Sequence, residues 1–195
     1  MRYIRFLHSF IFKETPSFFF DLFMMPIQNN RSQIALWMRK KIYNTRCVID
    51  TNVFIINRKN FFSGEGSALY HSCYILNQNG KFFIGNHSHL GAFCYVNVLQ
   101  GNLTIGDNVA IGPGTKIIVH SNHYQHGEKV TETKITRDIR IGNNVFIGAN
   151  CTILPGTVIQ DNVVIGAGSV IKGELLSNSM YGGVPCKELR AGWYA

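Results

Sequence analysis

The sequence predicts an all-β solenoid, in which short strands wind in stacked coils around one axis. The first observation is a period of six over 141–171, where the aliphatic residues are Ile141, Ile147, Ile153, Ile159, Ile165 and Ile171. The second is a small or β-branched residue four positions after each of the first five, namely Val145, Cys151, Thr157, Val163 and Ser169. A period of six fits neither a helix nor a long two-residue alternation, but it fits a flat strand of about four residues followed by a tight turn.

The interior and the corners of each coil follow from the same pattern. Three six-residue units close one triangular coil, so that aliphatic residues of successive coils stack in the interior. Glycine and asparagine tolerate the backbone angles of a sharp corner, and they occupy the expected turns at 106–108, 143–144 and 161–162. Two shorter runs come earlier, at Ile84, Leu90, Val96 and at Ile105, Ile111, Ile117. We therefore assign the coils to 47–173 and expect distorted early coils in 47–83.

Composition and charge limit the classes of protein to which this chain can belong. With 195 residues, 46% hydrophobic and 15% charged, the chain is long enough for one domain and too apolar to be disordered throughout. The formal net charge is +8, but residues 1–46 hold eight Lys and Arg against Glu14 and Asp21 and so account for +6 of it. No nucleic-acid-binding motif accompanies this charge, so we expect no nucleic acid as a partner.

The cysteines and the apolar segments indicate a compartment. Five cysteines with no CxxC pair argue against a disulfide framework or a zinc ribbon and favour a reducing cytosol. The aromatic stretch 18–25 is interrupted by Asp21 and does not predict a membrane span. His8 and Lys13 interrupt the first apolar run, which argues against a secretory signal. We expect a cytoplasmic protein.

Residues 1–46 are expected to form a basic, aromatic N-terminal appendage with a short helix at 32–44. Ser32 is the expected N-cap, and the helix carries one apolar stripe made of Ile34, Trp37, Met38 and Ile42. In the favoured interpretation this appendage caps the open end of the stack, whose apolar cross-section needs a cover. In the alternative it holds the protein at an anionic membrane surface, in peripheral contact with the inner membrane.

The six-residue period stops between Val119 and Ile139, and an extruded loop at 120–138 takes its place. A structureless insertion of this length in a compact solenoid is usually functional. This one holds His120, His123 and His126. From the residues alone three interpretations stay open: a histidine general base, a zinc site whose spacing is not distinctive, or an exposed polar loop that happens to contain histidines.

At these residues the chain resembles the hexapeptide-repeat acetyltransferase superfamily, whose fold is a left-handed parallel β-helix. The resemblance rests on IGNNVFIGANCTILPGTVIQDNVVIGAGSVI at 141–171 and GGVPCK at 182–187, and it covers roughly residues 84–190. These segments are similar to the branch of maltose, galactoside, streptogramin and polysaccharide O-acetyltransferases. The resemblance implies left-handed coils, a homotrimer with active sites between subunits, acetyl-CoA as cosubstrate and no required metal.

The resemblance also implies a catalytic base and marks a departure at the acceptor site. SNHYQHG is similar to the family's ANHxxDG, which places the base at His123, eighteen residues before Ile141. The family's sugar acetyltransferases commonly carry an acidic residue on the coil before the IGDN turn. Here that neighbourhood has no carboxylate before Asp107, and Asn97 and Tyr124 are the candidate substrate-binding residues.

The expected chemistry is direct attack of a substrate hydroxyl, deprotonated by the histidine, on the thioester of acetyl-CoA. Backbone N–H groups at a coil corner would stabilise the oxyanion. An acyl-enzyme is the rival mechanism. We reject it because Cys94 and Cys151 fall within strand-like units and are expected to pack in the core.

Candidate coenzyme-binding residues form two groups. Gly148 and Ala149 precede Gly166 and Ala167 by eighteen positions, or one coil, so both pairs share an edge where a groove for the pantetheine arm needs small residues. In the C-terminal tail, 174–195, Pro185 sets a bend before two cations suited to phosphates, Lys187 and Arg190. The resemblance adds Phe146, where the family has tryptophan, and Lys172, which sits one position earlier than in the family.

The sequence thus predicts an acetyl-CoA-dependent O-acetyltransferase acting on a sugar hydroxyl, with a surface polysaccharide or its precursor as the carbohydrate acceptor. An amino-sugar N-acetyltransferase and a streptogramin-type antibiotic acetyltransferase are alternatives within the enzyme class. A trimeric zinc protein similar to carbonic anhydrase and a non-catalytic scaffold are alternatives outside it.

Overall fold

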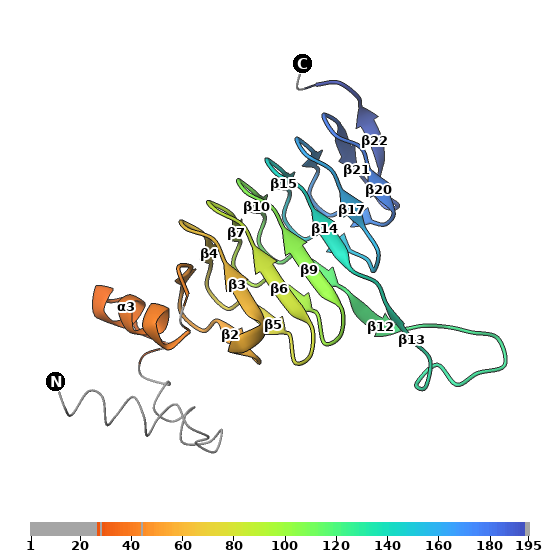
Figure 1. The fold of residues 1–195 in the computed structure, drawn as a ribbon. Coiled ribbons are helices and arrows are strands. Elements are labelled where there is room, and N and C mark those ends of the chain that lie inside the picture. The colour runs from red at the N-terminus through yellow and green to blue at the C-terminus, as the bar shows by residue number, and fades with distance from the viewer. Residues whose placement is uncertain (1–26, 28, 44, 194–195) are drawn as a thin grey trace.

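The protein is a stack of six parallel coils with a helix at one end and a hairpin projecting from one side (Figure 1). The computed structural model describes residues 27, 29–43 and 45–193, so most of the predicted N-terminal appendage lies outside the described residues. The predicted all-β solenoid is confirmed, and its parallel coils agree with the left-handed winding that the resemblance implies.

Each coil contributes one strand to each of three parallel sheets, named A, B and C here. Sheet A contains β1 (Val48–Ile49), β4 (Ala68–Leu69), β7 (His89–Leu90), β10 (Ala110–Ile111), β15 (Phe146–Ile147), β18 (Val164–Ile165) and β21 (Met180–Gly182), followed by the antiparallel β22 (Lys187–Arg190). Sheet B contains β2 (Phe54–Ile55), β5 (Tyr74–Leu76), β8 (Tyr95–Asn97), β11 (Lys116–Ile118), β16 (Thr152–Ile153) and β19 (Val170–Ile171). Sheet C contains β3 (Phe61–Ser63), β6 (Lys81–Ile84), β9 (Asn102–Ile105), β14 (Ile139–Ile141), β17 (Val158–Ile159) and β20 (Glu174–Leu175). A 3-10 helix, η1 (Arg58–Asn60), precedes β3.

The core is the column of inward-facing side chains that the six-residue period predicts. All the aliphatic residues of the three runs are at most 3% exposed, and so are the small residues four positions later, from Val109 to Ser169. The corners also agree with the prediction, since Asn108, Asn144 and Asn162 have positive φ angles of 57°, 53° and 58°. Asparagine is among the few residues with a side chain that adopt this left-handed region readily.

Chain length varies at one corner only, the corner between sheets B and C. Register places six positions between neighbouring strands at the other two corners, as from Ala110 to Lys116. At the B–C corner the separation is eight in the first coil (Phe54 to Phe62) and nine in the third (Tyr95 to Thr104). It returns to six in the fifth coil, from Thr152 to Val158. The early coils are therefore longer because of this corner, and the hairpin leaves the stack there.

The helix α3 (Gln33–Ile42) begins at the predicted cap, because the Ser32 hydroxyl accepts a hydrogen bond from the backbone N–H of Ala35. The predicted apolar stripe is buried only in part, since Met38 is half-buried and Ile42 packs against the core. Ile34 is 71% exposed and Trp37 is 60% exposed, whereas Ala35 and Arg39 are buried. The helix turns Arg39 inward because the guanidinium donates hydrogen bonds to backbone carbonyls of the first coil and of the segment before the helix.

Arg39 attaches α3 to the open end of the stack. Its Nε donates to the carbonyl of Ile49 in β1 at 2.7 Å, and its Nη1 donates to the carbonyls of Asn30, at 2.8 Å, and Ile27. These acceptors offset the cost of burying Nε and Nη1, whereas Nη2 is buried without a partner among the described residues. The helix therefore lies against the first coil through a buried cation together with apolar residues, since Ala35 is buried and Ile42 packs against the core.

At the other end the coils continue past residue 173, where the six-residue pattern ceases. Strand β20 pairs with β17 and β21 pairs with β18, both in parallel, so the first part of the C-terminal tail still belongs to the stack. The chain then reverses through Gly183 and a cis peptide bond at Pro185, and β22 runs antiparallel to β21.

Candidate active site

The histidine loop is built on a two-stranded stem. Strands β12 (His120–Asn122) and β13 (Lys134–Thr136) pair in antiparallel register, and Figure 1 shows them leading away from the stack between β9 and β14. The expectation of a structureless insertion is therefore corrected at its base. The pairing extends the ordered backbone to the position where His123 begins the outer part of the loop.

His123 is held by its backbone and leaves its side chain exposed. Its N–H donates to the carbonyl of Thr133 at 3.1 Å, and its own carbonyl accepts a hydrogen bond from the Thr133 hydroxyl. Within the described part of the chain its imidazole makes no hydrogen bond, so both ring nitrogens are open to a ligand. Tyr124 follows directly and is 68% exposed, which places the two predicted residues side by side.

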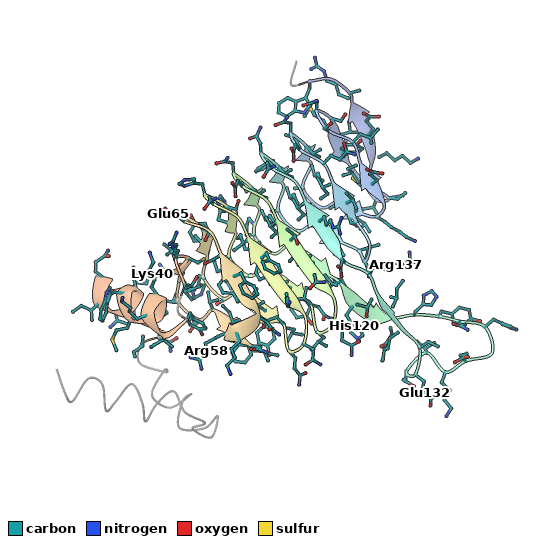
Figure 2. All side chains as sticks on the ribbon, in the orientation of Figure 1. Lys40, Arg58, Glu65, His120, Glu132 and Arg137 are labelled. Carbon is teal, nitrogen blue, oxygen red and sulfur yellow. The ribbon has the colours of Figure 1, made fainter. Side chains whose placement is uncertain are left out.

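His120 lies at the base of the stem, where Figure 2 labels it close to the coils. It is half-buried, and its Nδ1 lies 2.6 Å from the hydroxyl of Thr136 on the opposite strand. Its carbonyl accepts a hydrogen bond from the Nδ2 of Asn97 in β8 at 2.9 Å. The second candidate histidine is therefore engaged in holding the stem.

Asn97, predicted as a substrate-binding residue, has two partners of its own. Besides the bond to His120, its Oδ1 accepts from the N–H of Leu99 at 3.3 Å. Its side chain is half-buried on the coil that precedes the hairpin. The sequence did not indicate this contact, since no local pattern reports a bond across twenty-three residues.

The two Gly-Ala pairs lie at the corner between sheets A and B. They stack as expected, with the Gly148 N–H donating to Ile165 and the Gly168 N–H donating to Ala149, each at 2.8 Å. A Cβ at Gly148 would collide with the backbone of Ala167, so coil stacking alone requires that glycine. Gly166 differs, because the nearest atom to a Cβ there would be the Tyr181 carbonyl oxygen at 3.7 Å. Packing does not demand glycine at 166, and its edge is open.

The remaining predicted coenzyme residues surround the C-terminal end of the stack. Lys187 and Arg190 are exposed on β22, next to β21, and Pro185 is exposed just before them. Lys172 is exposed at the B–C corner, two coils beyond the hairpin. Phe146 is 50% exposed on the outer face of sheet A, between Ala110 and Val164.

One chain does not bring all these residues together. His123 projects from the B–C corner, whereas the Gly-Ala edge follows the A–B corner, with sheet B between them. A site that uses both groups therefore needs residues from a second chain, or a ligand that wraps around sheet B.

The cysteines are packed as predicted. Cys94 and Cys151 are 1% and 0% exposed, and the Cys151 thiol lies 3.4 Å from the carbonyl oxygen of Gly166. Burial raises the pKa of the Cys151 thiol, which lowers the population of the nucleophilic thiolate.

The described residues contain neither a candidate metal cluster nor a candidate membrane span. Over 27, 29–43 and 45–193, no three His, Cys, Asp or Glu side chains cluster in a way that could hold a metal ion. No helix in the same part of the chain is long and apolar enough to cross a membrane.

Comparison with known proteins finds similarity over the later coils. Residues 138–173 match the model described as bacterial transferase hexapeptide (six repeats). Galactoside O-acetyltransferase of Escherichia coli (strain K12) is 38% identical over 82 residues, which are 42% of this chain and 40% of that one. WbbJ of the same organism, assigned by name to lipopolysaccharide biosynthesis as an O-acetyl transferase, is 36% identical over 42% of this chain and 50% of its own length. The chain spans about half or less of the length of these relatives.

Solved structures share the fold. An N-acyltransferase mutant of Bacillus cereus, in complex with dTDP and coenzyme A, has a TM-score of 0.70 at 24% identity, covering 82% of this chain and 89% of that one. A maltose O-acetyltransferase of Clostridium difficile 630 has a TM-score of 0.61 at 23% identity, covering 88% and 84%. Residues 138–173, which form part of the stacked coils, are therefore similar to the bacterial transferase hexapeptide repeat.

Proposed function

We propose that this protein is an acetyl-CoA-dependent O-acetyltransferase that acts on a sugar hydroxyl of a surface polysaccharide or its precursor. The observation that carries the proposal is the exposed, unpartnered imidazole of His123 on a hairpin ordered at its stem, beside coils that match transferase repeats. The names of the E. coli relatives support the acetyl group and the hydroxyl acceptor.

The proposed reaction needs one proton-accepting side chain. His123 accepts the proton of the acceptor hydroxyl, since a neutral imidazole is an effective base near neutral pH. The hydroxyl oxygen then attacks the thioester carbonyl carbon, the C–S bond breaks, and the leaving thiolate of coenzyme A takes the proton from the imidazolium. Tyr124, adjacent and exposed, is the proposed contact to the acceptor.

The residues present fit a coenzyme at the C-terminal end of the stack. The open edge at Gly166 and Ala167 admits a thin arm close to the backbone, and Lys187 and Arg190 offer exposed cations for phosphate groups. Since His123 lies at another corner, we propose a homotrimer in which one subunit supplies the histidine and its neighbour the coenzyme edge. The proposed location is the cytoplasm, at or near a membrane surface.

The test compares three histidine variants of the full chain in a thiol-release assay with acetyl-CoA and a panel of oligosaccharides. We expect His123→Ala to lower kcat by about 100-fold or more, within the range that general bases contribute. His126→Ala, from the same exposed loop, should change kcat by less than about threefold. Binding of acetyl-CoA, measured by calorimetry, should be unchanged in both.

Four results would contradict parts of the proposal. Absence of acetyl-CoA binding at millimolar concentration would refute the transferase assignment. A loss of activity in His120→Ala but not in His123→Ala would move the base to His120. If 4-amino sugars are acetylated while every hydroxyl acceptor is inert, the protein is an N-acetyltransferase and not an O-acetyltransferase. If the protein is a monomer in analytical ultracentrifugation, the active site is not shared between subunits.

A further inference from the structure

A hollow of about 670 Å³ lies between α3 and the first coil, far along the chain from the histidine hairpin. It is lined by Trp37, Lys40, Lys41, Thr45, Arg46, Phe61, Phe62 and Ser63. The lining thus combines three cations, two hydroxyl groups and three aromatic rings. Figure 2 labels Lys40 at this end of the molecule, opposite the hairpin where Glu132 is labelled.

The described residues leave the positive charge of this hollow without a partner. Among them the lining contains no carboxylate, and Lys40, Lys41 and Arg46 form no ion pair. Asp50, which follows β1, lies 3.8 Å from Arg31 instead. The negative end of the helix dipole favours Lys40 and Lys41 in the last turn of α3, but it does not account for Arg46, which lies beyond the helix.

The donors suit a phosphate group. Ammonium and guanidinium groups make charge-assisted hydrogen bonds to phosphate oxygens, and hydroxyl groups add further donors. Thr45 and Ser63, both in the lining, are hydrogen-bonded to each other, so their hydroxyl groups are adjacent. Three cations and two hydroxyls around one opening form a site for an anion with several acceptor oxygens.

The apolar rim indicates which phosphate compound fits. Ile34, Trp37 and Lys41 are spaced by three and four residues, so they share one face of α3. Ile34 and Trp37 are 71% and 60% exposed, although burial would remove their apolar surface from water. A small soluble phosphate would leave both in water. A membrane surface would cover both, since tryptophan and aliphatic side chains favour the boundary between headgroups and acyl chains and adjacent lysines favour anionic lipid.

We propose that the hollow between α3 and the first coil binds the phosphate headgroup of an anionic phospholipid. Lys40, Lys41 and Arg46 contact the headgroup, and Ile34 and Trp37 enter the boundary between headgroups and acyl chains. This site is independent of acetyl transfer, and it holds whether or not the proposed function does.

The test measures partitioning of the full chain onto sedimentable vesicles. One set contains phosphatidylcholine with a quarter of phosphatidylglycerol, and the other contains phosphatidylcholine alone. The hollow variant is Lys40→Gln, Lys41→Gln, Arg46→Gln. The matched control is Lys116→Gln, Lys129→Gln, Arg140→Gln, which removes the same charge from exposed positions on sheets B and C and on the hairpin.

We expect the wild type to bind the anionic vesicles and not the neutral ones. The hollow variant should lose on the order of 100-fold in the partition coefficient, because each cation near an anionic surface contributes about fivefold. The control should lose less than about threefold, because its sheet positions lie three strands from the first coil, about 14 Å at ~4.8 Å per strand and beyond a Debye length. A Trp193→Phe variant leaves Trp37 as the only tryptophan, and its fluorescence should shift to the blue on binding.

Three results would overturn the proposal. Equal loss in the hollow variant and the control would mean that only the net charge matters. Binding of inorganic phosphate or glycerol 3-phosphate that the hollow variant abolishes, without any vesicle binding, would make the hollow a site for soluble anions. Trp37 fluorescence that is already blue-shifted and insensitive to vesicles would mean that another part of the protein, or a second copy, covers this face.

Discussion

The side-chain amide of Asn97 donates a hydrogen bond to the carbonyl of His120 at 2.9 Å, and so connects the third coil to the first residue of the hairpin stem. The two residues are twenty-three positions apart, and each belongs to a different coil. Among the described strands β12 and β13 pair only with each other. This bond, the one between His120 and Thr136, and the backbone bonds from Val119 to Asn97 and from Arg137 to Val119 together set the position from which His123 projects.

Replacing Asn97 should therefore weaken the hairpin more than the coils. In Asn97→Ala we expect a loss of about 1–2 kcal/mol in the free energy of unfolding, because a half-buried carbonyl loses its donor. Hydrogen exchange of the amides in 120–123 and 133–136 should accelerate, while exchange in the fifth and sixth coils stays unchanged. Gln100→Ala, an exposed neighbour, is the control, and equal protection of the stem in both variants would refute the role of Asn97.

The two corner glycines should respond differently to a methyl group. Gly148→Ala should destabilise the protein by about 1–3 kcal/mol in urea denaturation, because its Cβ would overlap the backbone of Ala167. Gly166→Ala should change stability by less than about 0.5 kcal/mol, since no atom lies within 3.7 Å of its Cβ.

The same pair tests the proposed coenzyme edge. Gly166→Ala should fold normally but weaken acetyl-CoA binding at least threefold in a calorimetric titration, because the added methyl narrows the open edge. Unchanged affinity in this variant would place the coenzyme elsewhere.

The buried guanidinium of Arg39 should matter more to stability than any other cation of α3. In Arg39→Met the side chain keeps its apolar length but leaves the carbonyls of Ile49, Asn30 and Ile27 without their donor. We expect a loss of about 3 kcal/mol in the free energy of unfolding. The neighbouring Lys40→Met, exposed on the same helix, should cost less than about 0.5 kcal/mol, and a comparable loss in both would show that charge rather than burial is responsible.

Thiol reactivity should separate Cys186 from the other four cysteines. Cys47, Cys73, Cys94 and Cys151 are buried, and burial raises the pKa of Cys47 to about 11, so its thiolate is scarce at pH 8. Cys186 is half-buried and should be the residue that an aromatic disulfide reagent titrates quickly in the native protein. Cys186→Ser should abolish that fast phase, and all five thiols should react in the wild type once guanidinium is added.

The sequence could predict the later coils well because each obeys one repeating physical rule. Ile147, Ile153 and Ile159 point inward at intervals of six, and glycine or asparagine permits each corner. The early coils were harder to delimit because the B–C corner is longer there, which interrupts the phase between Val96 and Ile105. Asn77, fully buried at that corner, exchanges hydrogen bonds with the backbone of Asn57 and carries no apolar signal.

The helix and the site show what a linear pattern cannot supply. The apolar stripe predicted that Ile34 and Trp37 would be buried, but both are exposed. Arg39 is buried instead, because its guanidinium binds a carbonyl at the open end of the stack. The stem of the hairpin was missed because His120, Ser121 and Asn122 have no apolar alternation. His123 and Tyr124 were singled out by resemblance, and their chemical roles stay a prediction.

The uneven B–C corner has a consequence for how this architecture can change. The other two corners keep a separation of six in every coil, as from Ala110 to Lys116 and from Arg140 to Phe146. At the B–C corner the stack already accommodates separations of six, eight and nine, and in the fourth coil a separation of twenty-four, from Lys116 to Arg140, without losing the columns of aliphatic residues. Segments of different length could replace 98–101 or 125–132 while the scaffold stays the same, so changes in chain length can accumulate along one ridge of the molecule.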